Sequence, residues 1–291
     1  MLTKVYSAAL HGADAREVEI EVNEGRGDPK VVIVGLPDAA VKESKDRVTT
    51  AMTNSGYHAP RGRTTINLAP ADIKKEGPSF DLPIALGMLA IVHGRELPRL
   101  ADGCVTGELA LTGAIRRVRG VLPIALEARR QGKKYLIVPA ENAEEASVVQ
   151  GIAVYGVKNL RECFEFLDGR IALTATVTDL EKIFHSEEPS QLDLAEVKGQ
   201  VGVKRAFEVA VAGGHNLLVL GAPGSGKSML AKRIPSIMPP MALEEAIETT
   251  KIHSVCGLLG GQHKFVSVRP FRAPHHTISD VGLLGGSSNP S

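Results

Sequence analysis

Apolar and polar positions alternate with two different periodicities along the first part of the chain. Runs with a two-residue period, or with continuous apolar character, predict strands, whereas apolar residues spaced three and four positions apart predict helices. The predicted strands are 2–10, 17–22, Lys30–Gly35, Arg63–Leu68, Tyr135–Val138 and Ala153–Val157. The predicted helices are Asp38–Asn54, Asp81–His93, Val121–Gln131, Ala140–Val149 and Leu160–Leu167. Because strands and helices alternate, the pattern predicts an α/β or α+β domain over residues 1–168.

The helix predicted after Lys30–Gly35 has the clearest local signals. Asp38 stands where an N-cap is expected, and Ser55-Gly56 follows as a stop. Four apolar residues fall on one face of this helix, namely Val41, Val48, Ala51 and Met52. We therefore expect this face to be buried against a sheet.

The pattern weakens after Asp168 and resumes with different elements. Residues 169–192 include the polar, proline-containing stretch Glu187–Gln191, which predicts a linker. A second domain is predicted over residues 193–291. Its predicted elements are a helix over Val201–Ala212, a strand over Asn216–Leu220, a helix over Ser228–Ile234 and a helix over Leu243–His253.

Composition limits the class of protein without identifying it. The chain has 291 residues, of which 43% are hydrophobic, and a formal net charge of +1, so global charge gives no argument for a nucleic-acid partner. The three cysteines lack the spacing of a zinc site or a disulfide framework. No apolar run has the length of a membrane span, and the N-terminus lacks the plan of a signal peptide. These features predict a cytoplasmic protein with reduced thiols and no membrane contact.

The stretch Gly221–Ser228 carries the most specific chemistry in the chain. Its residues fit the pattern G-x-x-x-x-G-K-[S/T] without a mismatch: Gly221, Ala222, Pro223, Gly224, Ser225, Gly226, Lys227 and Ser228. The glycines allow a tight loop whose backbone N–H groups point at a polyphosphate. Lys227 is expected to reach the β- and γ-phosphate oxygens, and the Ser228 hydroxyl is expected to be a ligand of the bridging Mg²⁺. The loop therefore predicts binding of ATP with Mg²⁺.

Several segments of the predicted first domain resemble a known family. They are Val34–Ser44, Ile66–Asp72, Lys75–Pro83 and Thr106–Gly113. Together they resemble the N-terminal domain of the bacterial magnesium-chelatase-like ATPases of the YifB/ComM family. The resemblance implies a fold similar to the proteolytic domain of Lon, a module like domain 2 of ribosomal protein S5, followed by an AAA+ ATPase module.

The Lon resemblance raises a peptidase as an alternative. Ser79 stands in Lys75–Ser79, a context that in Lon-type enzymes contains the nucleophile, and a serine needs a base to act as one. The resemblance places Leu122 where the Lon lysine should be, and leucine cannot accept a proton. Lys133 and Lys134 lie about a helix length further on. We expect Ser79 instead to cap the helix that begins near Asp81.

Two further segments of the second domain resemble the same family. The segment containing Val197 looks like the entry to an AAA+ module, which implies that Val197 contacts the nucleotide. Arg269–Ser279 resembles the family's second characteristic segment, and an insert that contacts neighbouring subunits or DNA is what the family suggests there. Its adjacent histidines lack a third ligand at useful spacing for a metal.

The residues after the glycine-rich loop set the limits of the expected chemistry. Between Met229 and Ser291 no apolar run ends in Asp-Glu, so the acidic Walker B motif is absent. The sequence predicts a truncated member that binds nucleotide and lacks the hydrolytic half. In its full-length form the resemblance implies a homo-oligomeric ring whose ATP cycle works on DNA. A magnesium-chelatase ATPase subunit, a Lon-type serine peptidase and a non-catalytic binding protein stay open as alternatives.

A basic stretch of the first domain is a candidate surface for nucleic acid. Residues 115–134 contain seven Lys and Arg residues, namely Arg116, Arg117, Arg119, Arg129, Arg130, Lys133 and Lys134, and a single acid, Glu127. No aromatic residue is interleaved with them to stack on bases. A contact with DNA or with another subunit and a solvated surface both account for this composition.

Overall fold

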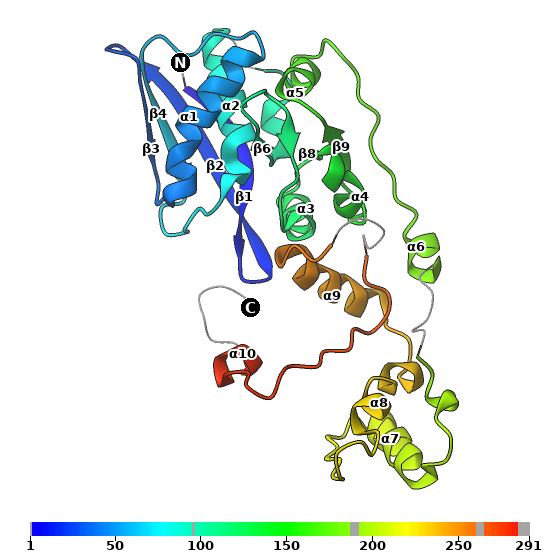
Figure 1. Cartoon of the computed structure of the whole chain (residues 1–291). Coiled ribbons are helices and arrows are strands. Elements are labelled where there is room, and N and C mark those ends of the chain that lie inside the picture. Colours follow the sequence, from blue (N-terminus) through cyan, green and yellow to red (C-terminus); the bar gives the residue numbers. More distant parts are fainter. Residues whose placement is uncertain (1, 95–96, 187–191, 260–264, 285–291) are drawn as a thin grey trace. The chain divides into compact units, whose positions relative to one another are not determined.

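The computed structural model of the chain describes residues 2–94, 97–186, 192–259 and 265–284. It divides into two compact units. The first unit comprises Met1–Asp179 and a second segment that starts at Lys251, and the other unit comprises Leu180–Thr250 and a segment that starts at Phe265. Each unit has its own architecture (Figure 1).

A four-stranded sheet forms one half of the first unit. Its strands are β1 (Leu2–His11), β2 (Asp14–Gly25), β3 (Lys30–Val34) and β4 (Arg63–Ala69), in the order β1-β2-β4-β3. β2 pairs with β1 and with β4 in antiparallel fashion, whereas β3 and β4 are parallel. A parallel pair needs a crossover connection, and α1 (Ala39–Asn54) provides it.

The helices α1 and α2 (Asp81–Val92) pack together over this sheet (Figure 1). The predicted cap of α1 is confirmed, since the Asp38 carboxylate accepts a hydrogen bond of 2.7 Å from the Val41 N–H. The four predicted apolar residues of α1 are all buried. Every residue of α2 from Asp81 to Ile91 is buried, so this helix lies inside the core rather than on its surface.

The second half of the first unit contains a parallel three-stranded sheet. Its order is β5-β8-β9, with β5 at Gly103–Val105, β8 at Tyr135–Pro139 and β9 at Ala153–Val157. The helices that follow or connect these strands are α3 (Val121–Arg130), α4 (Ala143–Ala146) and α5 (Leu160–Leu167). The helix predicted over Ala140–Val149 is shorter than expected, because its first turn, Ala140–Asn142, is a 3₁₀ helix. A short hairpin joins β6 (Glu108–Leu109) to β7 (Ile115–Arg116).

One continuous hydrophobic core holds the two sheets of the first unit together. Side chains from β1, β2, β4, α1, α2, α5 and β8 all contribute to it. Phe80, Leu82, Leu86 and Phe164 are among its most deeply buried members. The core explains why the alternating pattern of the sequence predicts this unit well: nearly every predicted inward position has a partner.

The end of α9 (Leu243–Val255) also belongs to the first unit. The Ser254 hydroxyl donates a hydrogen bond of 2.6 Å to the buried carboxylate of Glu145, and the Ser254 carbonyl accepts one of 3.0 Å from the Gly120 N–H. Lys251 pairs with Asp14 at 2.7 Å. Lys251 and Ser254 are therefore held by polar contacts to the β1–β2 hairpin, the start of α3 and α4.

The described residues of the second unit contain helices and no strand. They include α6 (Leu180–Ser186), α7 (Val201–Gly213), α8 (Lys227–Ala231), the start of α9 and α10 (Asp280–Leu284). The predicted linker over 169–192 did not anticipate α6, and its residues 187–191 lie outside the described part. One hydrophobic cluster of this unit contains the buried residues Leu194, Val197, Phe207 and Leu230, and Met241, Ala246 and Phe265 are also buried.

The strand predicted over Asn216–Leu220 is wrong. The segment is not a strand, and the Leu218 and Leu220 side chains are 81% and 83% exposed. A strand satisfies its backbone N–H and C=O groups only when it has a neighbour to pair with. The described residues of the second unit offer no such neighbour. The chain as a whole is a mixed α/β protein, and no helix within the described residues is long and apolar enough to cross a membrane.

Candidate nucleotide-binding site

The predicted phosphate loop lies directly before α8 in the second unit. Gly224 and Gly226 have φ angles of +81° and +87°, values that residues with a side chain rarely adopt. Gly226 is the N-cap of α8, and its carbonyl accepts the first hydrogen bond of the helix, 2.9 Å from the Leu230 N–H. Ser225 closes a turn within the loop by donating its N–H to the Ala222 carbonyl at 3.2 Å.

The glycine at the start of the loop lies close to the Ser225 side chain. A Cβ atom built on Gly221 would lie 2.9 Å from the Ser225 hydroxyl oxygen, so a larger residue would make that hydroxyl rotate away. The positive φ angles of Gly224 and Gly226 are the features expected of a backbone that curls around an anion.

Lys227 is the charged group of the loop. Its ammonium group donates hydrogen bonds of 2.7 Å to the Gly221 carbonyl and 2.9 Å to the Ala222 carbonyl. The lysine therefore reaches back over the loop, and its charge lies on the side where the loop begins. The role of Lys227 in binding phosphate stays a prediction.

Ser228 is the predicted ligand of Mg²⁺. It lies in the first turn of α8 and is exposed, so its hydroxyl is available to a metal ion that arrives with the phosphates. Within the described residues no group of three or more His, Cys, Asp and Glu side chains could hold a metal ion by itself. The residues present fit a magnesium ion that is held mainly by the nucleotide.

Val197 lies in the core that supports the loop. Its side chain is 6% exposed and belongs to the same apolar cluster as Leu230 of α8. Arg233, just after α8, donates a hydrogen bond of 3.1 Å to the Asp193 carbonyl and forms an ion pair of 3.0 Å with Glu196. The segment that contains Val197 is therefore tied to the phosphate-loop helix by apolar and polar contacts.

The segment Arg269–Ser279 is attached to the same unit through its first residue. The Arg269 guanidinium forms an ion pair of 2.7 Å with Glu245 and donates a hydrogen bond of 2.9 Å to the Pro239 carbonyl. The backbone hydrogen bond from Ala242, together with the hydrogen bond from Arg269, holds the pKa of Glu245 below its usual value. The His275 ring lies against the His276 ring with centroids 4.1 Å apart and bonds to Thr277.

The geometry around Ser79 does not form a nucleophile and base pair. Ser79 lies in a 3₁₀ turn, Pro78–Phe80, and its carbonyl accepts a hydrogen bond of 2.9 Å from the Gly107 N–H. Among the described residues no lysine bonds to its hydroxyl. The expectation that Ser79 caps α2 is wrong, because the N-cap position falls on Phe80 and no side chain caps the helix.

The two lysines considered as bases, Lys133 and Lys134, form ion pairs with other residues. Lys133 forms an ion pair of 2.9 Å with Glu17 and lies over the Tyr6 ring, and Lys134 pairs with Asp102 at 2.8 Å. Leu122 is fully buried in α3. The arrangement therefore gives no support to a peptidase.

Sequence reasoning missed one unusual lysine close to Ser79. Lys75 is fully buried, its ammonium group bonds to the Pro70 carbonyl, and burial lowers its pKa. Its backbone pairs with the Leu36–Asp38 segment, through hydrogen bonds of 3.3 Å to the Leu36 carbonyl and 3.0 Å from the Asp38 N–H. These contacts assign Lys75 a structural role in joining two loops, and the polar residue type gave no sign of its burial.

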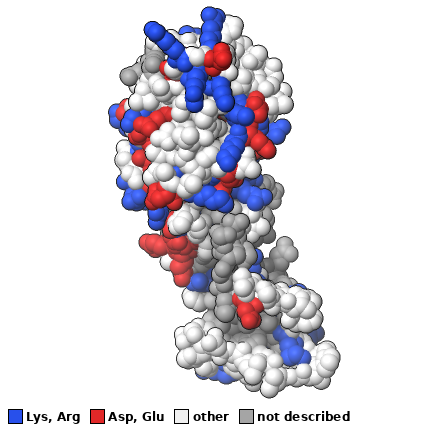
Figure 2. Space-filling view, turned by 90° about the vertical axis from the view of Figure 1, so that its left-hand side faces the viewer, with Lys and Arg blue, Asp and Glu red and all other residues white. Residues whose placement is uncertain are grey.

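The basic stretch 115–134 is largely neutralised within the first unit. Five of its seven cations form ion pairs, which are Arg116–Glu108, Arg117–Glu145, Arg130–Glu127, Lys133–Glu17 and Lys134–Asp102. On the face of the first unit shown in Figure 2, acidic and basic side chains are intermixed. The stretch as a whole is therefore not a continuous positive surface, and only particular residues of it have charge to offer a ligand.

The fold and the loop define a mixed α/β protein that carries a P-loop sequence, and comparison with known families agrees with this class. Residues 18–142 match the family described as subunit ChlI of Mg-chelatase, and residues 193–291 match the family described as magnesium chelatase, subunit ChlI. The chain belongs to the magnesium-chelatase-like family that includes the YifB and ComM proteins.

Individual relatives are similar over almost the whole chain. The competence protein ComM of Haemophilus influenzae is 43% identical over 290 residues, which are 99% of this chain and 57% of the relative. The uncharacterized protein YifB of Escherichia coli is 41% identical over 290 residues, 99% of this chain and 56% of the relative. The chain thus spans about half the length of the curated relatives it matches. Lon protease 2 of Bacillus subtilis is 25% identical over 164 residues, 51% of this chain and 29% of that protein.

Proposed function

We propose that the chain binds ATP together with Mg²⁺ at the loop Gly221–Ser228. The observation that carries this proposal is the loop itself, in which two positive-φ glycines precede a helix and the ammonium group of Lys227, the first residue of that helix, reaches back to the start of the loop. Lys227 would hold the β- and γ-phosphate oxygens, and the Ser228 hydroxyl would hold Mg²⁺, which neutralises phosphate charge. Family membership supports the same cofactors.

We also propose that this 291-residue chain binds nucleotide without turning it over. Hydrolysis by this class of ATPase needs an acidic residue after an apolar strand to hold Mg²⁺ and orient water. Residues 229–291 contain no apolar run that ends in Asp-Glu. The chain would therefore behave as a nucleotide-binding protein in isolation.

For the whole protein we propose a ring-forming, ATP-driven motor that acts on DNA in the cytoplasm. The support is the family relationship, which includes a protein named competence protein ComM. We further propose that residues 1–168 form a domain like the Lon proteolytic domain, that residues 169–192 are a linker, and that 193–291 begin an AAA+ module. The similarity to Lon protease 2 and the mixed sheets of the first unit support the first of these assignments.

The test is equilibrium binding of ATP in the presence of Mg²⁺, measured by titration calorimetry on three proteins. The parent chain should bind, and Lys227→Ala should bind at least about tenfold more weakly, because one charge-assisted hydrogen bond contributes about 1.5–3 kcal/mol. Lys232→Ala is the matched control, since it removes an exposed lysine just after α8. Equal loss in the two variants, or no binding by the parent, would refute the proposal.

A further inference from the structure

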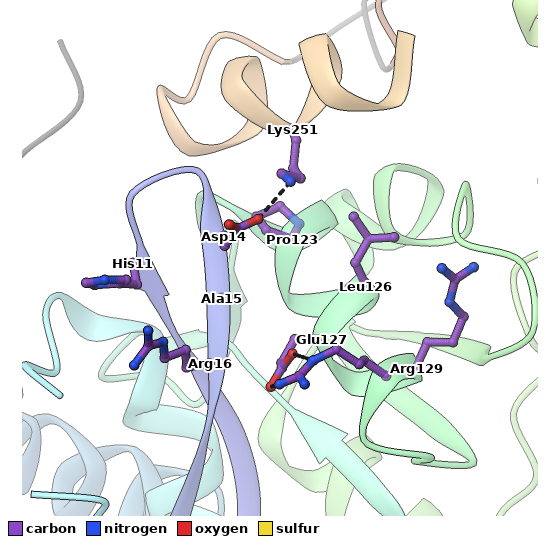
Figure 3. A pocket seen from close by; sticks show the side chains of 10 residues that line it. His11, Asp14, Ala15, Arg16, Pro123, Leu126, Glu127, Arg129 and Lys251 are labelled. Atoms are coloured by element: carbon purple, nitrogen blue, oxygen red, sulfur yellow. Dashed lines mark hydrogen bonds and ion pairs between the residues drawn. The ribbon is translucent and has the colours of Figure 1, made fainter. Parts of the chain in front are cut away.

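A pocket of about 550 Å³ lies in the first unit between the β1–β2 hairpin and α3 (Figure 3). The hairpin lines it with His11 and Asp14–Arg16, and α3 lines it with residues from Pro123 to Arg130. Lys251 reaches it from α9 and pairs with Asp14 in Figure 3. Its volume falls in the range of about 300–1,000 Å³ that is usual for small-molecule sites.

The lining of this pocket is mainly basic. The lining contains four cations, Arg16, Arg129, Arg130 and Lys251, and two carboxylates, Asp14 and Glu127, and His11 also contributes to it. Both carboxylates are already engaged, Asp14 with Lys251 at 2.7 Å and Glu127 with Arg130 at 2.6 Å. Each ion pair therefore cancels one charge of each sign, and a positive excess is left.

Glu127 does not oppose an incoming anion. It is 6% exposed, and besides Arg130 it accepts hydrogen bonds from the Glu17 N–H at 3.2 Å and the Gln131 side chain at 2.9 Å. The hydrogen bond from Arg130 holds the pKa of Glu127 below its usual value. Its negative charge is thus compensated by donors that stay in place.

The positive excess resides on Arg16 and Arg129. Neither guanidinium pairs with a carboxylate among the described residues, and Arg129 donates one hydrogen bond of 3.3 Å to the Gln150 carbonyl. In Figure 3 Arg16 extends from the hairpin and Arg129 from the end of α3, so they stand at two sides of the pocket. Between them lie the apolar residues Ala15, Pro123 and Leu126, together with Asp14 and Glu127 in their ion pairs.

We propose that this pocket binds a phosphate-bearing ligand through the guanidinium groups of Arg16 and Arg129. Arginine presents planar, paired N–H donors that match the oxygens of a phosphate group. The apolar residues between the two arginines would contact the organic part of the ligand. The phosphate could belong to a free phosphorylated molecule or to a nucleic-acid backbone. The site is separate from the loop Gly221–Ser228 and does not depend on the function proposed for that loop.

The experiment uses the full chain with Lys227→Ala, which removes the principal cation of the phosphate loop. Inorganic pyrophosphate and a single-stranded oligonucleotide are titrated separately by calorimetry at one fixed ionic strength. Arg16→Ala/Arg129→Ala is compared with Arg26→Ala/Arg61→Ala. The control arginines are exposed, have no ion pair among the described residues and lie outside the pocket, so the two variants lose the same charge.

The pocket variant should bind at least one of the two probes about tenfold more weakly, whereas the control variant should change by less than about twofold. Loss with pyrophosphate identifies a free phosphorylated molecule as the ligand class, and loss with the oligonucleotide alone identifies a nucleic-acid backbone. Equal weakening in both variants would show unspecific attraction to positive charge and would overturn the proposal. Absence of binding of either probe to the Lys227→Ala chain would overturn it as well.

Discussion

The two units of this protein differ in how much of their apolar surface they cover. In the first unit every residue of α2 from Asp81 to Ile91 is buried. In the second unit Val201, Leu218 and Leu220 are 77%, 81% and 83% exposed, and the cluster that packs against α8 has four buried residues, Leu194, Val197, Phe207 and Leu230. Since burial of apolar surface is the main source of folding free energy, stability is concentrated in the first unit.

This difference also separates the two candidate sites. The pocket at the β1–β2 hairpin adjoins β1 and β2 of the large core, and the Asp14–Lys251 and Glu127–Arg130 ion pairs hold part of its lining in place. The phosphate loop is held by glycine geometry, by Arg233 and by a small core around Phe207. We therefore expect the loop to respond to a ligand more than the pocket does, because weakly packed regions open locally at low free-energy cost.

The largest effect should come from replacing one buried phenylalanine by alanine in each unit. Phe164 and Phe207 are 0% and 1% exposed. Phe164→Ala should destabilise the first unit by about 3–5 kcal/mol, whereas the small core around Phe207 can close over a cavity, so Phe207→Ala should cost less. All four tyrosines lie in the first unit, so tyrosine fluorescence in urea reports its unfolding while circular dichroism follows the whole chain.

Phe207→Ala should in turn weaken ATP binding, which Phe164→Ala should leave unchanged under conditions where the protein stays folded. Phe164→Ala and Phe207→Ala could instead lower the free energy of unfolding reported by tyrosine fluorescence by equal amounts. That result would show that stability is not concentrated in the first unit.

A second pair of variants compares a buried ion pair with an exposed one. Asp81 is fully buried and bonds to Arg47 at 2.9 Å, to the Ser44 hydroxyl and to the Leu109 N–H at 3.3 Å. Asp81→Ala should cost about 3–5 kcal/mol because it removes a fully buried carboxylate to which Arg47, the Ser44 hydroxyl and the Leu109 N–H all donate. Asp102→Ala, which removes an exposed partner of Lys134, should cost about 1 kcal/mol or less.

Urea unfolding of both variants decides this comparison. A cost for Asp81→Ala no larger than that for Asp102→Ala would mean that the buried cluster around α1 and α2 contributes little to the core.

The smallest expected effect is a change in how the stability of the protein depends on acidic pH. The Arg130 hydrogen bond lowers the pKa of Glu127, so the folded protein favours the ionised carboxylate. The ionised Glu127 therefore contributes to the free energy of unfolding. This contribution is fully present above the ordinary glutamate pKa of about 4.3 and is lost as the pH falls through the lower pKa that Glu127 has in the folded protein. The urea midpoint of the parent should therefore fall more steeply below about pH 4 than that of Glu127→Gln. Parallel pH curves would contradict the assignment.

Local signals in the sequence predicted the elements that depend on near neighbours. Asp38 and the apolar face of α1 were predicted because a cap and a helical face involve residues a few positions apart. The strand over Asn216–Leu220 could not be judged in the same way, since a strand forms only with a partner elsewhere in the chain. Ser79 failed as a cap for a similar reason, because Gly107 and Thr106 fix its backbone from another segment.

The two candidate sites differ in the same way, since one depends on neighbouring residues and the other on distant segments of the chain. The loop Gly221–Ser228 is one continuous motif, so its residues could be named from the sequence. The pocket at the hairpin unites Arg16, Arg129 and Lys251, which are more than a hundred residues apart, and only the fold brings them together. The basic stretch 115–134 pointed to part of it, yet the sequence could not tell which of its cations are neutralised by ion pairs.

The most direct test of the account is amide hydrogen exchange of the chain with and without ATP and Mg²⁺. Amide exchange in Gly221–Lys232 should be slower when nucleotide is present, exchange in α2 should be unchanged, and Lys227→Ala should show no slowing. Nucleotide-dependent slowing that is absent from the loop, or that persists in Lys227→Ala, would contradict the assignment of the nucleotide to the second unit.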